Sequence, residues 1–425
     1  MINIRMEKVL RGVEKFIPGP VYRFFQPIYH FLLTLFGHII YRFPSQKIRV
    51  VGITGTKGKT SVVEFADAVF RAGGHKTALA SSLHFKIGEN DTRNTKRMST
   101  PGRFFLPRLM RKAISQGCDT VILEMTSEST KQFRHLFIEL DALIFTNLAP
   151  EHIESHGSFE KYRDAKLKLA KRLRNSKKHP KFMVANVDDE HGKTFLETAS
   201  VTNKPYSLSD LDHFDARSDG SVFTYKGTTV NSHFPGKFSI SNMLAVAVLS
   251  DSFGITVDAI KKGLESVTEI KGRVERITSE KGFTVIVDYA HTPDSLKALY
   301  SAYPHARKIC VLGSTGGGRD KWKRPEMGKV ADELCDHVIV TNEDPYDEDP
   351  KEIIDHVARG VTRHKAEIIL DRREAIRSAV SKADKGDVVF VTGKGTDPCI
   401  CGPNGSKIPW DDMSVVKEEI EKLDK

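Results

Sequence analysis

Short runs of apolar residues recur along most of the chain, separated by longer stretches in which apolar positions follow a helical spacing. The first run, residues 47–54, is apolar almost throughout, which is typical of a strand buried on both faces of a sheet. A glycine-rich turn and a helical pattern at residues 60–72 follow it. Further strands are expected at 119–124, 141–146, 181–186, 283–288, 308–313, 336–341, 366–370 and 387–392.

Alternating strands and helices predict an α/β protein. The strands fall into two series, so we expect a central domain with a mostly parallel sheet at residues 47–270 and a Rossmann-like C-terminal α/β domain at residues 271–425. Each stretch is long enough to bury a hydrophobic core of its own. A short basic helical segment, residues 1–46, would precede them.

Residues 21–43 (VYRFFQPIYHFLLTLFGHIIYRF) carry a different pattern. Polar residues recur there every three or four positions, which places a narrow polar stripe on one side of a helix and a wide apolar face on the other. The segment is too polar to be assigned as a membrane-spanning helix. Two alternatives stay open: a helix packed on the next domain or on a second subunit, and an interfacial helix at an anionic membrane. The polar stripe consists of Arg23, Gln26, His30, Thr34, His38 and Arg42.

Composition narrows the class of protein. The chain has 425 residues and a formal net charge of +10, and residues 1–47 supply half of that charge. No basic patch interleaved with aromatic residues and no nucleic-acid motif is present, so we expect no nucleic-acid partner. The five cysteines do not form an evenly spaced framework, and no secretion signal precedes them. A reduced cytoplasmic protein is expected, with the membrane contact of residues 21–43 as an open alternative.

The clearest chemical motif, GITGTKGKTS at residues 52–61, lies between an expected strand and an expected helix. Glycines there let backbone N–H groups approach phosphate oxygens, and the helix N-terminus adds a favourable partial charge. Lys59 can neutralise nucleotide phosphates, and the Thr60 hydroxyl can bind Mg²⁺. A chance glycine-rich turn is the alternative. We predict a P-loop-type central domain that binds ATP and Mg²⁺ through Gly55, Thr56, Gly58, Lys59, Thr60 and Ser61.

This loop resembles the ATP-binding loop of the Mur ligase family, which includes the folylpolyglutamate synthases. Further family motifs follow in order over most of residues 48–425. Glu124 in LEMTSEST matches a Mg²⁺-binding glutamate, His152 in TNLAPEH matches a metal-binding histidine, and Lys166 in YRDAKLKL matches a carbamylated lysine. The resemblance implies Lys59, Glu124, His152 and Lys166 as catalytic residues, and Thr60, Glu124, His152 and Lys166 as metal ligands.

Each of these residues also has an ordinary structural explanation. Glu124 is a charge at a strand end, His152 and His156 are spaced to pack on one side of a helix, and Lys166 lies in a basic helix. Taken alone, each ordinary explanation would be preferred. Their order behind a phosphate loop favours the catalytic set.

The second half of the chain carries further family motifs. Asn242, in GKFSISN, matches an asparagine on the adenine side of ATP, although Ser239 stands where the family usually has Asn. Arg273, in GRVER, would reach ATP, and Asp288 and His291 belong to DYAHTP, a family signature. The resemblance therefore adds these four residues, Asn242, Arg273, Asp288 and His291, to the nucleotide site.

Within the family, the chain is most similar to the synthetases that form the muramyl tripeptide of cell-wall precursors. The similarity implies an ATP-dependent ligase that adds an amino acid to a UDP-N-acetylmuramyl-peptide through an acyl phosphate. Thr100-Pro101 resembles the stretch that holds the nucleotide sugar. The residues implied in substrate binding are Thr100, Pro101, His156, Arg319, Asp344, Pro345, Tyr346, Gly393 and Asp397.

Two features depart from those synthetases. The domain that binds the uridine nucleotide in those synthetases is expected to be missing. Either residues 1–46 bind the nucleotide instead, or the acceptor substrate differs. Where synthetases for diaminopimelate read D-N-P-R, this chain reads E-D-P-Y, and Tyr346 cannot make the bidentate carboxylate contact of an arginine. Their G-K-G-H-E is here G-K-G-T-D, at residues 393–397. Diaminopimelate is therefore doubtful, and lysine or another amino acid stays open.

Two other functions also stay open. A folylpolyglutamate-synthase-like ligase, or another ligase with a different acceptor, would explain the short N-terminal segment. A non-catalytic ATP-binding protein at a membrane would explain residues 21–43, but the complete catalytic set argues against it. The sequence does not predict the oligomeric state.

Overall fold

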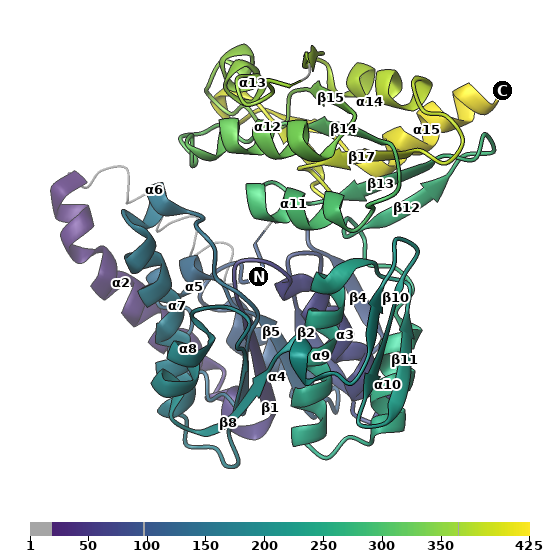
Figure 1. Cartoon of the computed structure of the whole chain (residues 1–425). Coiled ribbons are helices and arrows are strands. Elements are labelled where there is room, and N and C mark those ends of the chain that lie inside the picture. The colour runs from purple at the N-terminus through teal and green to yellow at the C-terminus, as the bar shows by residue number, and fades with distance from the viewer. Residues whose placement is uncertain (1–18, 97, 364) are drawn as a thin grey trace.

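A computed structural model describes residues 19–96, 98–363 and 365–425. Two α/β domains, each built around one large sheet, lie one above the other in Figure 1, and helix α2 (Gly19–Ile40) lies on the outer edge of the first. Part of the basic N-terminal segment falls outside the described residues, namely Arg5, Lys8, Arg11 and Lys15.

The first sheet has eight strands in the order β4-β3-β2-β5-β1-β6-β7-β8. Strands β2, β5, β1, β6, β7 and β8 run parallel, and β3 and β4 form an antiparallel edge. Strand β1 is buried along nearly all its length, which explains its apolar run. The bounds are β1 Arg49–Thr54, β2 Thr77–Ala80, β3 His84–Ile87, β4 Asn90–Arg93, β5 Thr120–Glu124, β6 Ala142–Phe145, β7 Phe182–Asn186 and β8 Thr202–Tyr206.

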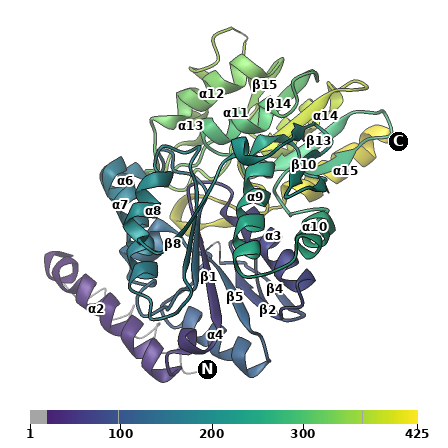
Figure 2. The same ribbon diagram turned by 60° about the horizontal axis from the view of Figure 1, so that its bottom comes forward.

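Helices cover both faces of this sheet, and each face has its own hydrophobic core. Figure 2 shows α3, α9 and α10 on one side of β1, and α7 and α8 on the other. A small sheet, β9 to β11, extends the first core. The bounds are α3 Lys59–Ala72, α4 Phe105–Ser115, α5 Ser127–Lys131, α6 Ile153–His156, α7 Phe159–Arg174, α8 Gly192–Ala199, β9 Phe214–Ala216, β10 Ser221–Tyr225, β11 Thr228–Ser232, α9 Gly236–Ser252 and α10 Val257–Ser266.

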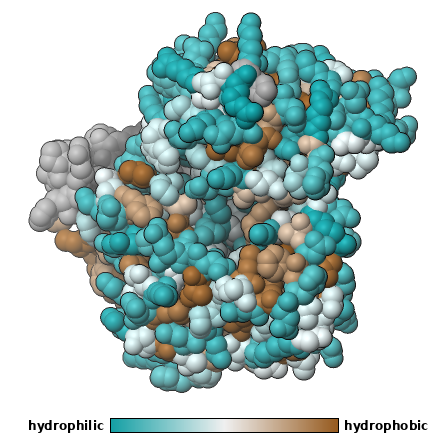
Figure 3. Space-filling view, in the orientation of Figure 1, coloured by the Kyte–Doolittle hydropathy of each residue, from teal (hydrophilic) through white to brown (hydrophobic). Residues whose placement is uncertain are grey.

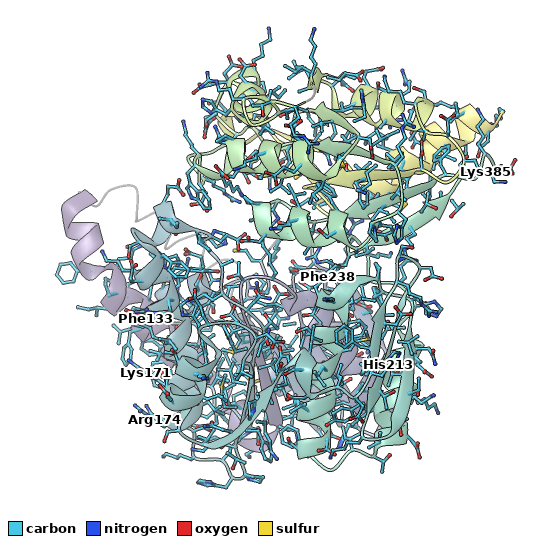
Figure 4. All side chains as sticks on the ribbon, in the orientation of Figure 1. Phe133, Lys171, Arg174, His213, Phe238 and Lys385 are labelled. Atoms are coloured by element: carbon cyan, nitrogen blue, oxygen red, sulfur yellow. A yellow bond between two sulfur atoms is a disulfide. The ribbon has the colours of Figure 1, made fainter. Side chains whose placement is uncertain are left out.

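The second sheet has the order β12-β13-β17-β14-β15-β16, and only β12 is antiparallel. Phe238, at the start of α9, packs against the core of this second domain and so joins the two halves (Figure 4). The bounds are β12 Glu275–Thr278, β13 Thr284–Asp288, α11 Pro293–Ser301, β14 Lys308–Leu312, α12 Lys323–Leu334, β15 His337–Val340, α13 Pro350–Ala358, β16 Glu367–Ile368, α14 Arg372–Ser381, β17 Val388–Thr392, β18 Cys399–Cys401, β19 Lys407–Pro409 and α15 Asp412–Asp424.

Every predicted strand is present, with bounds that differ by at most two residues. The strands that the pattern missed are short or polar; β4, for example, is exposed at all four positions because it lies at the sheet edge. The expectation for the cysteines was wrong in one respect. Cys310 on β14 and Cys335 after α12 form a disulfide, although 25 positions separate them in the sequence.

Helix α2 confirms the predicted helix at residues 21–43, and it continues through Pro27. The middle of its polar stripe faces the protein: His30, Thr34 and His38 are buried, whereas most of its described large apolar side chains are exposed. In the part of the chain that the structure describes, no helix has both the length and the apolar character needed to cross a bilayer.

Candidate active site

The phosphate loop joins β1 to α3 at the carboxyl edge of the first sheet. Strands β5 and β6 run parallel to β1 on either side, so their carboxyl ends lie beside this loop. Glu124 is the last residue of β5, and Thr146 directly follows β6. Gly58 has a φ of +81°, and a Cβ there would collide with the Asn242 side chain. A Cβ at Gly55 would collide with the Thr146 hydroxyl. Both positions therefore require glycine, and Asn242 lies directly against the loop.

Two lysines converge on one carbonyl oxygen of this loop. Lys59 Nζ donates to the carbonyls of Gly55 at 3.0 Å and Thr56 at 2.9 Å, and Lys166 Nζ donates to that of Gly55 at 2.7 Å. Burial lowers the pKa of Lys59, and burial together with the positive charge of Lys59 holds the pKa of Lys166 well below its usual range. A lysine with a lowered pKa has a larger neutral amine fraction, which is the form that adds to carbon dioxide.

The first pair of predicted magnesium ligands also comes together. Thr60 Oγ1 lies 3.2 Å from Glu124 Oε2 and 2.9 Å from Ser82 Oγ. Arg273 reaches over from the second domain, and its Nη2 donates to Thr60 Oγ1 at 3.3 Å. The same guanidinium stacks 4.8 Å from the centroid of the Tyr289 ring. The ATP-side arginine and the loop hydroxyl thus meet across the domain boundary.

Glu151, which precedes His152, ties the loop to the second domain. Its Oε1 accepts from Lys57 Nζ at 2.9 Å and lies 3.0 Å from His291 Nε2. Burial, with the positive charge of Lys57, lowers the pKa of His291 to about 3. Burial also lowers the pKa of His152. Both imidazoles are therefore neutral at pH 7, and a neutral imidazole is the form that binds a metal ion.

The carboxylates of Asp320 and Glu154 each accept hydrogen bonds from backbone amides of the opposite domain. The Asp320 carboxylate accepts from the amides of His152 at 2.6 Å and Ile153 at 3.0 Å. In return, the Glu154 carboxylate accepts from the amides of Asp320 at 2.6 Å and Lys321 at 3.2 Å. The backbone position of His152 is thus held by the second domain.

A cavity lies between the two domains beside these groups. Four predicted site residues line it, and so do four charged residues that the motifs did not single out. The guanidinium of Arg319, which lines the cavity, lies 5.5 Å from the centroid of the Tyr346 ring. The predicted residues are His152, His291, Arg319 and Asp397, and the others are Glu151, Asp320, Lys323 and Glu343.

Several predicted residues lie elsewhere or have structural partners. The Asp344 carboxylate accepts from Lys394 Nζ and from the Cys401 amide, each at 2.7 Å, inside the second domain. The Asp288 carboxylate accepts from the amides of Val274 and Ala290 and so shapes its own loop. Residues of the substrate set that do not line the cavity are Thr100, Pro101, His156, Asp344, Pro345, Tyr346 and Gly393.

His156 and Thr100 have local partners within the first domain. His156 Nε2 lies 3.2 Å from Ser127 Oγ, and the Thr100 carbonyl accepts from Arg134. Lys57, Glu151 and Asp320 were missed because family motifs assign roles to the residues beside them. Their signal in the sequence was a charged residue directly next to a motif residue, which is too common to single out.

Within the described residues, no group of three or more His, Cys, Asp or Glu side chains could hold a metal ion. The predicted set depends instead on the Thr60 hydroxyl, the Glu124 carboxylate, neutral His152 and a modified Lys166. Mg²⁺ prefers oxygen ligands, so this set fits it only if Lys166 carries a carbamate, because an ammonium group has no lone pair. The lowered pKa of Lys166 favours that modification.

Comparison with known proteins decides the family. Residues 53–250 match the Mur ligase middle domain, and residues 272–395 match the Mur ligase glutamate ligase domain. The UDP-N-acetylmuramoyl-L-alanyl-D-glutamate--2,6-diaminopimelate ligase of Bacillus cereus is 33% identical, over 91% of this chain and 81% of its own length. The chain belongs to the Mur ligase family. The resemblance inferred from the motifs is confirmed, and with it the α/β fold.

Other members of the family are similar over the same extent. The UDP-N-acetylmuramyl-tripeptide synthetase of a Roseiflexus species is 34% identical over 90% of this chain and 80% of its own length. A solved structure of a UDP-N-acetylmuramoyl-L-alanyl-D-glutamate--2,6-diaminopimelate ligase has a TM-score of 0.63 at 26% identity, covering 92% of this chain and 82% of that one. As a Mur ligase, the protein is an ATP-dependent acid–amino-acid ligase that uses Mg²⁺.

Proposed function

We propose that this Mur ligase adds an amino acid to a UDP-N-acetylmuramyl-peptide in the synthesis of peptidoglycan precursors. The proposal rests on one observation: Lys59, Lys166 and Thr60 all lie at the same phosphate loop, and Glu124 lies beside them. The names of relatives at 33% and 34% identity support the muramyl-peptide acceptor.

Amide formation from a free carboxylate requires a leaving group, which phosphoryl transfer from ATP provides. The carboxylate and the γ-phosphate are both anions, so the site must offset their repulsion. Lys59 and the loop amides hold the phosphates, and Arg273 contacts the nucleotide from the second domain. Thr60 with Glu124, and His152 with carbamylated Lys166, would hold Mg²⁺. Bound Mg²⁺ supplies the positive charge that lets the carboxylate approach the phosphate.

The carbamate forms when the neutral Lys166 amine attacks carbon dioxide, which makes one C–N bond and releases one proton. The lowered pKa of Lys166 favours this step because it raises the fraction of neutral amine. The product is an anion that can bind a metal ion, whereas the ammonium group cannot.

The proposal is tested by phosphate release from ATP over a panel of UDP-muramyl-peptides and amino acids, with a folate acceptor as a separate arm. We expect release with one muramyl-peptide acceptor and one amino acid. Phosphate release with the folate acceptor alone would identify the protein as a ligase of the folylpolyglutamate-synthase type. ATP binding without phosphate release for any acceptor and amino acid would favour a non-catalytic protein.

We propose that the two domains, divided near residue 270, close on this site and that Asp320 positions His152 in the closed form. The Asp320→Ala variant is expected to lower kcat roughly tenfold, because two amides lose a charged acceptor, while the affinity for ATP stays unchanged. Asp320→Asn, which keeps one carbonyl acceptor, should recover part of the rate. Steady-state kinetics check this, with Asp294→Ala, an exposed carboxylate on α11, as the control.

A purely structural role for Asp320 predicts another outcome. In that case the melting temperature falls in Asp320→Ala, kcat per folded molecule is unchanged, and Asp320→Asn gives no graded recovery.

We propose that the incoming amino acid binds in the cavity between the domains, with its α-carboxylate near Arg319 and an amino group near Asp397. Tyr346 offers no second guanidinium, so lysine or another amino acid without a distal carboxylate is favoured over diaminopimelate. The Tyr346→Arg variant is expected to raise kcat/KM for diaminopimelate relative to lysine by roughly tenfold. Competition between the two amino acids measures this ratio, with Tyr346→Phe as the control. An unchanged ratio in Tyr346→Arg would place the distal carboxylate away from this loop.

We further propose that the ligase contacts a membrane peripherally through residues 21–43. The support is the inverted polarity of α2 and the basic N-terminal sequence.

A further inference from the structure

Helix α2 is attached to the central domain by its polar side. Arg103 Nη2 lies 2.6 Å from His30 Nδ1, and the centroid of the buried His38 ring lies 5.7 Å from that of Phe137, with the two planes tilted by 55°. A Cβ at Gly37 would come within 3.2 Å of the Arg103 carbonyl, so glycine allows α2 to lie close to the start of α4. The side that an amphipathic helix usually presents to water is therefore the side that this helix buries.

The opposite side of α2 carries a concentrated apolar surface. Of the twelve exposed large hydrophobic side chains in the described residues, seven lie on this one helix, each between 39% and 57% exposed. No charged residue occurs between positions 24 and 41. Scattered apolar residues are normal on a surface, but a contiguous patch marks an interaction site. The patch consists of Phe25, Ile28, Phe31, Leu32, Phe36, Ile39 and Ile40, and Figure 3 shows hydrophobic surface at this outer edge.

Basic side chains flank the apolar surface. Helix α4 contacts α2 directly and contains no acidic residue, and Arg172 of α7 lies close enough to His38 to lower its pKa, after the larger effect of burial. Lys171 and Arg174 project from α7 on the side of the molecule that carries α2 (Figure 4). Within the described structure no ion pair joins the exposed bases of these two helices to a carboxylate; they are Arg108, Lys112, Lys161, Lys168, Lys171 and Arg174.

We propose that this face docks on an anionic lipid bilayer, with α2 lying in the plane of the membrane surface. This deepens the membrane contact proposed above and does not depend on the ligase reaction. The apolar side chains would enter the boundary between headgroups and acyl chains, and the bases of α4 and α7 would meet the negative surface. Because α2 is attached through its polar side, it need not leave the protein to insert.

A second copy of the chain fits the same face less well. A symmetric dimer through α2 would bring equivalent surfaces together, so the exposed bases on α4 and α7, which outnumber the acidic residues Glu160 and Asp164 of α7, would face their own counterparts. An anionic bilayer supplies the opposite charge instead. The docked orientation also brings Arg103, three positions after Thr100, to the membrane side of the first domain.

Vesicle flotation of the full chain, without substrates, tests the proposal. We expect the chain to float with vesicles of phosphatidylcholine and phosphatidylglycerol, and at least tenfold less with phosphatidylcholine alone. The double variant Ile28→Glu/Ile39→Glu should lower binding to the anionic vesicles at least tenfold. The matched control is Ile408→Glu, a somewhat more exposed isoleucine on β19 of the second domain, and it should float like the unmodified chain. Lys168→Glu/Lys171→Glu should reduce the preference for anionic lipid.

The remaining outcomes overturn the proposal. A chain that does not float, and that sediments as a dimer which Ile28→Glu/Ile39→Glu dissociates, assigns the face to a second copy. Flotation that is lost on removal of residues 1–18 but unchanged in Ile28→Glu/Ile39→Glu assigns membrane binding to that segment. Ligase activity is measured separately in solution, so failure to float and failure of the proposed reaction are distinguished.

Discussion

The Lys166→Ala variant is expected to lose the ligase reaction, with kcat lowered roughly a hundredfold to a thousandfold. Lys166 is buried beside the phosphate loop, and its proposed carbamate would pair with neutral His152 as a metal ligand. Its removal leaves a small cavity without that anion. Bicarbonate or a small carboxylate such as acetate, which can occupy the cavity, should restore part of the rate. Phosphate release from ATP measures both effects.

Lys168→Ala, an exposed lysine two positions along the same helix, is the control and should keep full activity. Carbon-13 NMR with labelled bicarbonate provides a direct readout, since a carbamate signal should be present in the unmodified chain and absent from Lys166→Ala. The signal should strengthen as pH rises through the lowered pKa of Lys166, because only the neutral amine reacts. Full activity of the folded Lys166→Ala protein, or no carbamate signal in the unmodified chain, would contradict the role proposed for Lys166.

The Lys59→Met variant should have the second large effect, a fall in kcat/KM for ATP of roughly a hundredfold or more. In the structure the Lys59 ammonium group is held by two loop carbonyls, where it is positioned to turn toward bound phosphates. Methionine keeps most of the side-chain volume and removes the charge. Isothermal titration calorimetry with ATP and Mg²⁺, together with phosphate release, separates weaker binding from slower chemistry.

Lys47→Met, an exposed lysine just before β1, is the matched control for Lys59→Met and should bind ATP normally. If Lys59→Met binds and hydrolyses ATP like the unmodified chain, the loop at residues 52–61 does not hold the reacting phosphates. The P-loop assignment would then have to be abandoned even though the fold is that of a Mur ligase.

Local pattern was sufficient for much of the fold. A buried parallel strand needs a continuous apolar run, so β1, β5 and β6 could be located to within two residues from their own sequences. The phosphate loop was equally local, because its glycines and its lysine act within ten consecutive residues. Short edge strands such as β4 were missed, since a strand that is exposed on both faces has no apolar run to reveal it.

The sequence by itself determined the two series of strands, the phosphate loop, the Mur ligase motifs and the amphipathic character of residues 21–43. Only the tertiary structure decided which charged groups meet across the domains, as Glu151 does with His291 and Asp320 does with the backbone of His152. Only the tertiary structure decided that the polar side of α2 faces inward. The physical reason is that periodicity specifies which residues share a face, whereas the partner of that face depends on sheet order and domain packing.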